Sequence, residues 1–240
     1  MRTLTWDGYP NSRDLGGLAT PLSPTGSTRC GRVARGPRRE LLTGRGWGDA
    51  RAWGLRTVVD LRCDVEVGRR DGDPEVARSA RDGIDVVLAP TEDQDDPEFR
   101  RVCFPILDSP EYWAHNWRLQ PALVRTSLQA VADAGPGVLV HCSAGRDRTG
   151  MLSTLLLGNA GVSPQEVAAD YATSVREMAR SETASPTQDR QRGWTDAQVD
   201  AFLARAVPIV HDVAARTSEA FDALGLAAAH RRELRDLLTA

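Results

Sequence analysis

The sequence predicts an α/β fold in which a central, largely parallel sheet is flanked by helices. Short apolar, β-branched runs alternate along the chain with longer stretches that have apolar residues at helical spacing. Such alternation favours strand–helix–strand units with parallel strands. The 240 residues suffice for one domain with a sizeable core. Within it we expect a loop-rich segment over residues 1–50, an α/β core over 51–180 and a helical cap or lid over 181–240.

Three short runs in the expected core have the character of buried strands. Residues 57–62 are apolar and β-branched before the chain turns polar, as in a strand that ends in a loop. Residues 84–89 are closed by a proline, and residues 138–140 are introduced by Gly-Pro-Gly. The N-terminal fifth of the chain, rich in Gly, Pro, Ser and Arg, offers one further candidate at residues 32–35.

Helical patterns separate and follow these strands. Ser163 caps one helix, with Pro164 at its first position and Glu166 closing the capping box. Thr195 and Gln198 form the same pattern for another helix. The polar residues 181–193 are expected to be a connector. The predicted helices are residues 112–134, 149–158, 164–180, 196–206, 208–223 and 227–238.

Composition and charge narrow the choice of partners. Hydrophobic residues make up 41% of the chain and charged residues 26%, which is ordinary for a globular protein. The net charge of −3 and the absence of a basic tract argue against nucleic acid or an anionic membrane as the main partner. All 30 basic residues are arginine, so an arginine at a given position says little about specificity.

The chain begins MRTLTWDGYP, without the apolar core of a signal peptide, and its apolar stretch at residues 151–157 is too short to span a bilayer. We therefore expect a cytoplasmic protein with no integral membrane segment, export by a route without a conventional signal being the alternative. The cysteines are widely spaced and form no C-x-x-C pair, so neither a zinc site nor a disulfide framework is expected. They are Cys30, Cys63, Cys103 and Cys142.

One short stretch, HCSAGRDRTG at residues 141–150, carries most of the functional signal. It follows a predicted strand and opens a predicted helix, the place where ligands bind in parallel α/β folds. A helix N-terminus presents unpaired N–H groups and a partial positive charge, and Gly145 lets the backbone turn its amides inward. The pattern predicts an anion-binding loop.

The side chains of this loop suit attack on phosphorus. The positive field stabilises a thiolate, so Cys142 is expected to be an ionised nucleophile. Arg148 supplies a planar fork that matches two phosphoryl oxygens. Thr149 can donate a hydrogen bond to the sulfur when it leaves, and His141 can orient the loop. The alternative, a small buried hydrophobic cysteine, leaves the rest of the pattern unexplained.

Four segments resemble one protein family. Residues 141–150 resemble the phosphate-binding loop of the protein tyrosine phosphatase superfamily. Residues 11–17, NSRDLGG, resemble the N-F-R-D-L-G-G opening of a bacterial branch of that superfamily, residues 58–62 its D-L-R strand, and residues 170–174 its D-Y-x-x-S helix. The segments occur in the family's order and span roughly two-thirds of the chain, residues 11–174.

The resemblance implies a tyrosine-phosphatase-like sheet and a cysteine-dependent phosphomonoester hydrolase with a phosphocysteine intermediate and no metal or other cofactor. Members of the branch act on phosphotyrosine, some also on phosphoserine, phosphothreonine or phosphoinositides. The expected partner is thus a phosphorylated protein or a phospholipid headgroup. The resemblance assigns phosphate binding to Ser143, Ala144, Gly145, Arg146, Asp147, Arg148 and Thr149.

Two positions depart from the pattern of the branch. Ser12 stands where a phenylalanine is usual, so this part of the opening segment is expected to pack differently. Arg146 stands where the branch generally has lysine, a position associated with additional phosphates on the substrate. The chain contains no lysine at all, so an arginine at this position keeps the positive charge of the usual residue. Phosphoinositide activity therefore stays a possibility.

The reaction needs a general acid for the leaving oxygen and then a base for the attacking water. Asp147, in the loop itself, is the first candidate, although a solvated surface charge is its alternative. Asp60 ends a neighbouring strand and is second; its alternative is to pair with an arginine and hold the loop. Asp108, in a proline-containing loop, is third, with helix capping as its alternative.

Several other residues have roles that the sequence leaves open. Arg13 and Asp14 can orient the loop or contact substrate, but a packed ion pair is favoured. Cys63 could form a protective disulfide with Cys142 under peroxide, although an inert thiol is favoured. The acidic run at residues 92–98 is expected to be a solvated loop. The resemblance makes the helices after residue 176 a lid, with the 181–193 connector as its hinge.

Two other functions remain possible from the residues alone. A sulfur transferase also places a cysteine on an anion-binding loop, but Arg148, Thr149 and Gly150 argue against it. A catalytically idle phosphate-binding module usually lacks the nucleophile or the arginine, and both are present here.

Overall fold

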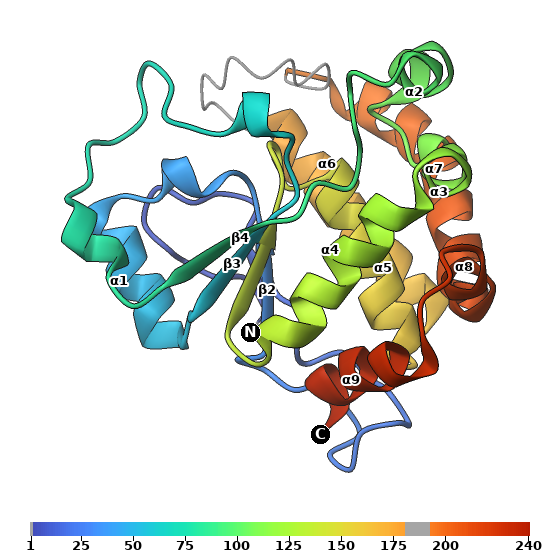
Figure 1. Ribbon diagram of the computed structural model, residues 1–240, viewed down its shortest axis with the longest axis horizontal. Helices are drawn as coiled ribbons and strands as arrows, with labels where there is room; N and C mark the ends of the chain where they lie inside the picture. The colour runs from blue at the N-terminus through green and yellow to red at the C-terminus, as the bar shows by residue number, and fades with distance from the viewer. Residues whose placement is uncertain (1, 181–192) are drawn as a thin grey trace.

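The computed structural model describes residues 2–180 and 193–240, which form a five-stranded sheet with helices on both faces (Figure 1). The strand order is β1-β2-β5-β3-β4, and every pairing is parallel except that of β1 with β2. The predicted α/β class with a largely parallel sheet is confirmed. The strands are β1 Arg13–Asp14, β2 Val33–Gly36, β3 Thr57–Asp60, β4 Asp85–Leu88 and β5 Val138–His141.

The helices of the described residues fall into one that covers one face of the sheet, α1, and a group on the other face that includes α4 and α5 (Figure 1). They are α1 Gly44–Trp53, α2 Pro97–Cys103, α3 Tyr112–Leu119, α4 Pro121–Ala134, α5 Asp147–Asn159, α6 Pro164–Arg180, α7 Asp196–Ala215, α8 Thr217–Ala223 and α9 Ala228–Thr239. Short 3-10 turns lie at Arg39–Leu41, Asp64–Glu66, Arg78–Arg81 and Phe104–Ile106.

Alternation along the strands divides the core into two clusters, because successive side chains of a strand point to opposite faces. Val58 and Leu139 pack in the cluster on the α1 side. Val59, Val138 and Val140 pack in the larger cluster on the other face. Strands β2, β3 and β5 are therefore buried on both sides, which explains why β3 and β5 read as continuous apolar runs. The prediction of a buried strand is wrong for residues 84–89, because β4 lies at the edge of the sheet and its four residues are exposed.

Helix α5 is the centre of the larger cluster. Its residues 148–157 are all buried, so it lies inside the protein rather than on its surface. α7 packs against α5 and α6, and α9 packs against α4 and α5. Side chains of α7, α8 and α9 belong to the same apolar cluster as α5, which makes the C-terminal helices part of one core. In the described ranges, 2–180 and 193–240, no helix has the length and apolar character that a bilayer crossing requires.

The structure corrects two predicted helix boundaries. Residues 112–134 form two helices, α3 and α4, because Pro121 disfavours a helical backbone at Gln120 and begins a new helix. The predicted break before Pro208 is wrong, since α7 continues through this proline to Ala215. The 181–193 connector lies, except for Gly193, outside the described residues.

The sequence analysis missed two helices that depend on local capping. α1 has a glycine-rich sequence, but Thr43 accepts a hydrogen bond from the amide of Gly46 at its start. α2 begins where Asp96 accepts from the amide of Phe99, so the acidic run is not simply a solvated loop. The two-residue strand β1 is too short to produce a readable pattern.

Replacement of a buried side chain of α5 tests its central position. Leu155→Ala removes apolar volume at a site with 0% exposure and should lower the free energy of unfolding. We expect a loss of about 2–5 kcal/mol in denaturant titrations. Val65→Ala, at a side chain that is 86% exposed, is the control and should change stability by no more than about 0.5 kcal/mol. Equal small changes in both variants would contradict the central role of α5.

Candidate active site

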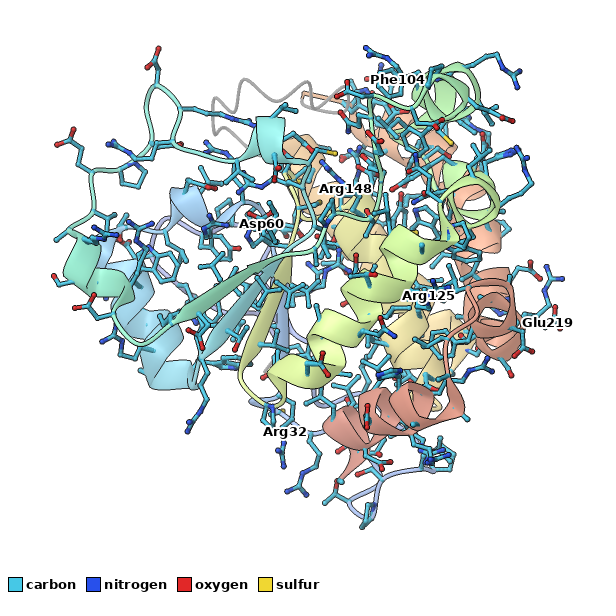
Figure 2. All side chains as sticks on the ribbon, viewed as in Figure 1. Arg32, Asp60, Phe104, Arg125, Arg148 and Glu219 are labelled. Atoms are coloured by element: carbon cyan, nitrogen blue, oxygen red, sulfur yellow. The ribbon has the colours of Figure 1, made fainter. Side chains whose placement is uncertain are left out.

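The segment between β5 and α5 lies at the carboxyl edge of the sheet, beside the end of β3. Figure 2 shows Asp60, which ends β3, and Arg148, in the first turn of α5, at this edge. β5 is the middle strand of the sheet, paired with β2 on one side and β3 on the other. The predicted strand–loop–helix arrangement of residues 138–159 is present.

Three consecutive carbonyl groups of the loop, at residues 143–145, are held by donors from the N-terminal part of the chain. The amide of Arg38 donates to the first at 3.0 Å, Asn11 Nδ2 to the second at 3.1 Å and Arg35 Nη2 to the third at 2.7 Å. In a planar trans peptide the N–H points away from the C=O. The N–H groups that follow these carbonyls are therefore directed to the opposite side, an arrangement that suits the binding of an anion.

Gly145 is required by close packing as well as by its backbone angle. Its φ is +72°, and a Cβ atom there would lie 2.5 Å from the main chain of Gly36. No side chain fits at that distance. The glycine thus lets the loop approach β2 closely enough for Arg35 to reach its carbonyl oxygen.

A buried carboxylate, Asp170 of α6, organises the arginines around the loop. It accepts hydrogen bonds from Arg13 Nε at 3.0 Å, Arg35 Nη1 at 2.6 Å and Arg2 Nη2 at 2.7 Å. Burial by itself raises the pKa of Asp170, but the arginine charges outweigh it and hold the pKa well below its usual range. Arg13 also donates to Ser174 at 2.6 Å. This contact explains why the opening segment and the D-Y-x-x-S helix occur together.

Arg13 therefore forms a packed ion pair, as favoured from the sequence, although its partner is Asp170. Asp14 has a different place. It accepts from the amides of Gly16 and Gly31, both at 2.8 Å, and from Trp53 Nε1 at 2.9 Å. These contacts fix the N-terminal loop against α1, so Asp14 is a structural residue of that loop.

Cys142 is 2% exposed at the start of the loop. Two buried hydroxyl groups nearby in the chain, Ser143 Oγ and Thr149 Oγ1, have no hydrogen-bond partner within the described part of the protein. They can donate to a phosphoryl oxygen or to the sulfur. His141 Nδ1 lies 3.0 Å from the carbonyl oxygen of Cys142. Burial is the main reason that the pKa of His141 falls to about 4, so the ring is neutral and supports the loop without charge.

Arg148 is held by two carboxylates that the sequence analysis did not assign to the site. Glu66 binds both terminal nitrogens of the guanidinium, with 2.7 Å between Nη2 and Oε1. Glu92 Oε1 lies 3.5 Å from Nη1. Burial alone lowers the pKa of Arg148, but the charges of Glu92 and Glu66 and the hydrogen bond from Glu66 raise it well above its usual value.

The geometry leaves one edge of the Arg148 guanidinium open. Glu66 occupies the end formed by Nη1 and Nη2. Nε and the adjacent hydrogen of Nη2 make no hydrogen bond to any residue in 2–180 or 193–240. These two parallel N–H groups are the donors that a phosphoryl group accepts in bidentate form.

The prediction of a solvated acidic loop is wrong for Glu92, which is 2% exposed. It follows β4 at the same edge of the sheet as the loop, so the strand order brings it to Arg148. A correct strand order would have been enough to assign Glu92 to the site from the sequence. Glu66 closes a capping box with Cys63, and a cysteine in the capping position hides the usual sequence signature.

Asp60 is fully buried and bound by arginines. Arg62 donates to it from Nε at 2.9 Å and from Nη2 at 2.7 Å, and Arg39 makes a further contact. Burial raises the pKa of Asp60, but the hydrogen bond from Arg62, the charge of His141 (protonated only below about pH 4) and the charges of Arg62 and Arg39 lower it to about 2. A carboxyl group with that pKa is ionised at neutral pH. Its contacts therefore favour the structural alternative over the general acid.

Asp147 and Asp108 differ from Asp60 in their surroundings. Asp147 is the first residue of α5, and its carboxylate accepts from Arg146 Nε and Nη2, both at 3.0 Å. The side chain is 18% exposed, so solvent reaches it. Asp108 is half-buried in the turn before α3. Both carboxylates contribute, after burial, to raising the pKa of Tyr171, which places them near the same side chain.

Cys63 is half-buried, and its thiol donates to the carbonyl oxygen of Glu92 at 3.2 Å. Burial and the charge of Glu92 raise the pKa of Cys63 to about 11, so it is protonated at neutral pH. All four cysteines are free. In the part of the chain that the structure describes, no group of three or more His, Cys, Asp or Glu is arranged to hold a metal ion.

Comparison with known proteins defines the class. The chain is a phosphatase-type hydrolase, because almost its whole length, residues 4–240, matches a phosphatase family. More specifically, it belongs to the tyrosine phosphatase family.

Its relatives include the triple specificity protein phosphatase PtpB of Mycobacterium tuberculosis, 32% identical over 70% of this chain and 67% of the relative. A putative tyrosine-protein phosphatase of Cupriavidus necator is 30% identical over 71% of this chain and 62% of its own length. A solved structure of Pseudomonas aeruginosa TpbA is matched with 17% identity and a TM-score of 0.35, over 83% of this chain and 97% of that one.

The low pKa of Asp60 makes stability depend on acid pH. The ordinary pKa is 3.8 and the folded value about 2, so this carboxylate stabilises the fold above pH 3.8 and loses its effect as the pH falls toward 2. Asp60→Asn should therefore cost about 2 kcal/mol at pH 7 and much less near pH 2. Denaturant unfolding at both pH values measures the difference. An equal cost at both would show that the charge of Asp60 does not stabilise the fold.

Proposed function

We propose that the protein hydrolyses phosphate monoesters through a phosphocysteine formed on Cys142, with phosphotyrosine in proteins as its main substrate. The observation that carries the proposal is the open edge of Arg148 beside a loop whose carbonyls are held outward. A phosphoryl group can accept from this edge and from the loop amides at once. A cytoplasmic location is part of the proposal.

The first step of the proposed reaction transfers the phosphoryl group to sulfur. The thiolate of Cys142 attacks phosphorus, an S–P bond forms, and the bond from phosphorus to the ester oxygen breaks. Asp147 gives its proton to the leaving oxygen. Arg148 and the loop amides hold the three remaining phosphoryl oxygens as charge shifts between them.

The second step returns the enzyme to its resting state. Asp147, now ionised, accepts a proton from water while the water oxygen attacks phosphorus, and the S–P bond breaks. The leaving sulfur regains its negative charge and accepts hydrogen bonds from the hydroxyls of Thr149 and Ser143, which have no other described partner. Inorganic phosphate is the product.

Asp147 is favoured as the acid because it is partly exposed at the loop, whereas Asp60 is buried among arginines. Asp108 is the remaining alternative. The guanidinium of Arg146 lies against Asp147, so it can support that carboxylate and also meet a second phosphate of the substrate. Phosphoserine, phosphothreonine and phosphoinositide activity are secondary parts of the proposal, consistent with a relative named as having triple specificity.

The alternatives are a sulfur transferase and an idle phosphate-binding module. The open bidentate edge of Arg148 favours an oxyanion of phosphorus over a sulfur donor. The pairing of that arginine with a thiol on the same loop favours turnover over binding alone.

Loss of the nucleophile separates these possibilities. The protein should release phosphate from p-nitrophenyl phosphate, and Cys142→Ser should abolish the release while phosphate still binds. Cys30→Ser, at an exposed cysteine, is the matched control and should retain full activity. Turnover that survives in Cys142→Ser would refute the phosphocysteine.

The general acid is identified by its dependence on the leaving group. Asp147→Asn should lower kcat about 100-fold on an alkyl phosphate, whose leaving oxygen needs a proton, and far less on p-nitrophenyl phosphate. Asp60→Asn and Asp108→Asn are compared on the same pair of substrates. An equal loss on both substrates argues against Asp147, and a selective loss in either other variant assigns the acid there.

Arg146 is tested on substrates that carry more than one phosphate. Arg146→Ala should lower kcat/KM for a phosphoinositide by about tenfold or more, because it removes one charged hydrogen-bond contact to the additional phosphate. It should affect a phosphotyrosine peptide to a smaller extent. Initial rates on both substrates give the ratio, and an unchanged ratio would remove Arg146 from substrate selection.

A further inference from the structure

The catalytic arginine faces two carboxylates but has bidentate geometry with only one of them. Glu66 takes the end of the guanidinium formed by Nη1 and Nη2. Glu92 lies to the side, with Oε1 at 3.5 Å from Nη1, and forms an ion pair with Arg148 without a hydrogen bond. The reaction described above uses Arg148 and leaves the role of Glu92 unexplained.

The two oxygens of Glu92 are in different surroundings. Oε1 accepts a hydrogen bond from Gln94 Nε2 at 2.7 Å and faces Arg148. Oε2 is buried and has no partner within the described ranges. A buried carboxylate oxygen without a donor is costly when charged. This atom can take a proton without the loss of any contact in the site.

Groups from every side of Glu92 act on its charge. Arg148 of α5 and Gln94 of its own loop favour the ionised form, while Glu66 and Asp147 oppose it. Burial is the largest effect, and together these influences raise the pKa of Glu92. The Tyr112 hydroxyl, Cys63 and Cys103 are other titratable groups that feel the charge of Glu92.

A bound phosphate changes this balance. With both carboxylates ionised, Arg148 faces two negative groups. A phosphoryl group on the edge formed by Nε and Nη2 adds negative charge to the same guanidinium, and this charge disfavours the ionised form of the carboxylate that faces Nη1.

We propose that Glu92 takes up a proton from solvent, on Oε2, when a phosphate group binds in the loop. Nη1 of Arg148 then faces a neutral Glu92 while Nε and Nη2 bind the phosphoryl oxygens, and Glu66 stays bound to Nη1 and Nη2. Glu92 is thus a positioning residue that acts through Arg148. The inference rests on the proposed function, because it requires that phosphate bind at this loop.

Proton uptake on binding has a reciprocal consequence. If phosphate binding favours protonated Glu92, protonated Glu92 must favour phosphate binding by the same factor. Phosphate affinity should therefore decrease as the pH rises through the pKa that Glu92 has in the free protein.

Calorimetry measures the proton directly. Inorganic phosphate is titrated into Cys142→Ser, which lacks the thiol, in two buffers of different ionisation enthalpy at several pH values between about 5 and 8, around the ordinary carboxyl and histidine range. The difference in heat gives the protons taken up. The phosphate's own ionisation is common to all variants. Cys142→Ser should take up as much as one proton more than Cys142→Ser combined with Glu92→Gln.

Glu66→Gln, in the same Cys142→Ser background, is the matched control. The hydrogen bond and charge of Arg148 outweigh burial and lower the pKa of Glu66, so it stays ionised over this range. Its replacement removes a contact of Arg148 and should weaken phosphate binding, while proton uptake persists because Glu92 is still present. Glu92→Asp, which keeps a titratable group, should restore uptake.

Three results would contradict either the inference or the proposed function on which it rests. Equal proton uptake with and without Glu92→Gln overturns the inference. No phosphate binding to a folded Cys142→Ser protein instead contradicts the proposed function. If Glu92→Gln does not fold, infrared difference spectra of Cys142→Ser provide the test, and the absence of a new carboxylic acid band on phosphate binding overturns the inference.

Discussion

The site depends on the hydrogen bonds that keep the carbonyl groups of residues 143–145 pointing away from the expected phosphate position. Without them the amides of the loop could not all face one side, and the negative charge of a ligand would have no backbone donors. The donors come from the first forty residues, through Asn11, Arg35 and the amide of Arg38. The loop that carries Cys142 and Arg148 is thus held in place by a distant part of the chain.

Arg35 connects the loop to a buried ion-pair cluster, because it binds both the carbonyl oxygen of Gly145 and the carboxylate of Asp170. Removal of one partner from a buried charge cluster leaves the others unpaired, which is far more costly than the loss of one contact. Asp170, Arg13 and Arg35 therefore act as a unit. The unit explains two of the sequence motifs that lie far from the loop.

Much of the fold could be predicted from the sequence because its strongest apolar patterns coincide with strands of the central sheet, although the run at residues 84–89 formed an exposed edge strand. The runs at residues 57–62, 84–89 and 138–140 became β3, β4 and β5, and the capping box at Ser163 began α6. α1 could not be predicted, since its glycines oppose a helix and its Thr43 cap is visible only with the coordinates. The split at Gln120 was available from Pro121, but the apolar spacing outweighed it.

The site was likewise predictable where it depends on local sequence and unpredictable where it depends on distant elements. Residues on the loop were readable because sequence neighbours share one turn. Glu66 and Glu92 reach Arg148 from other elements, and only the strand order shows that their positions converge. The acidic run that contains Glu92 suggested solvent, because charged residues are seldom buried without partners. The partner of both carboxylates is Arg148, which the sequence analysis had assigned to phosphate binding alone.

The Asp170 cluster also bears on how the protein is made. Its ion pairs connect residues separated by 135 to 168 positions along the chain. Synthesis proceeds from the N-terminus, so Arg2, Arg13 and Arg35 leave the ribosome long before their carboxylate. The loop at residues 143–145 cannot gain its full support until about 70% of the polypeptide has emerged. A growing chain therefore carries Cys142 before the contacts that hold its loop are complete.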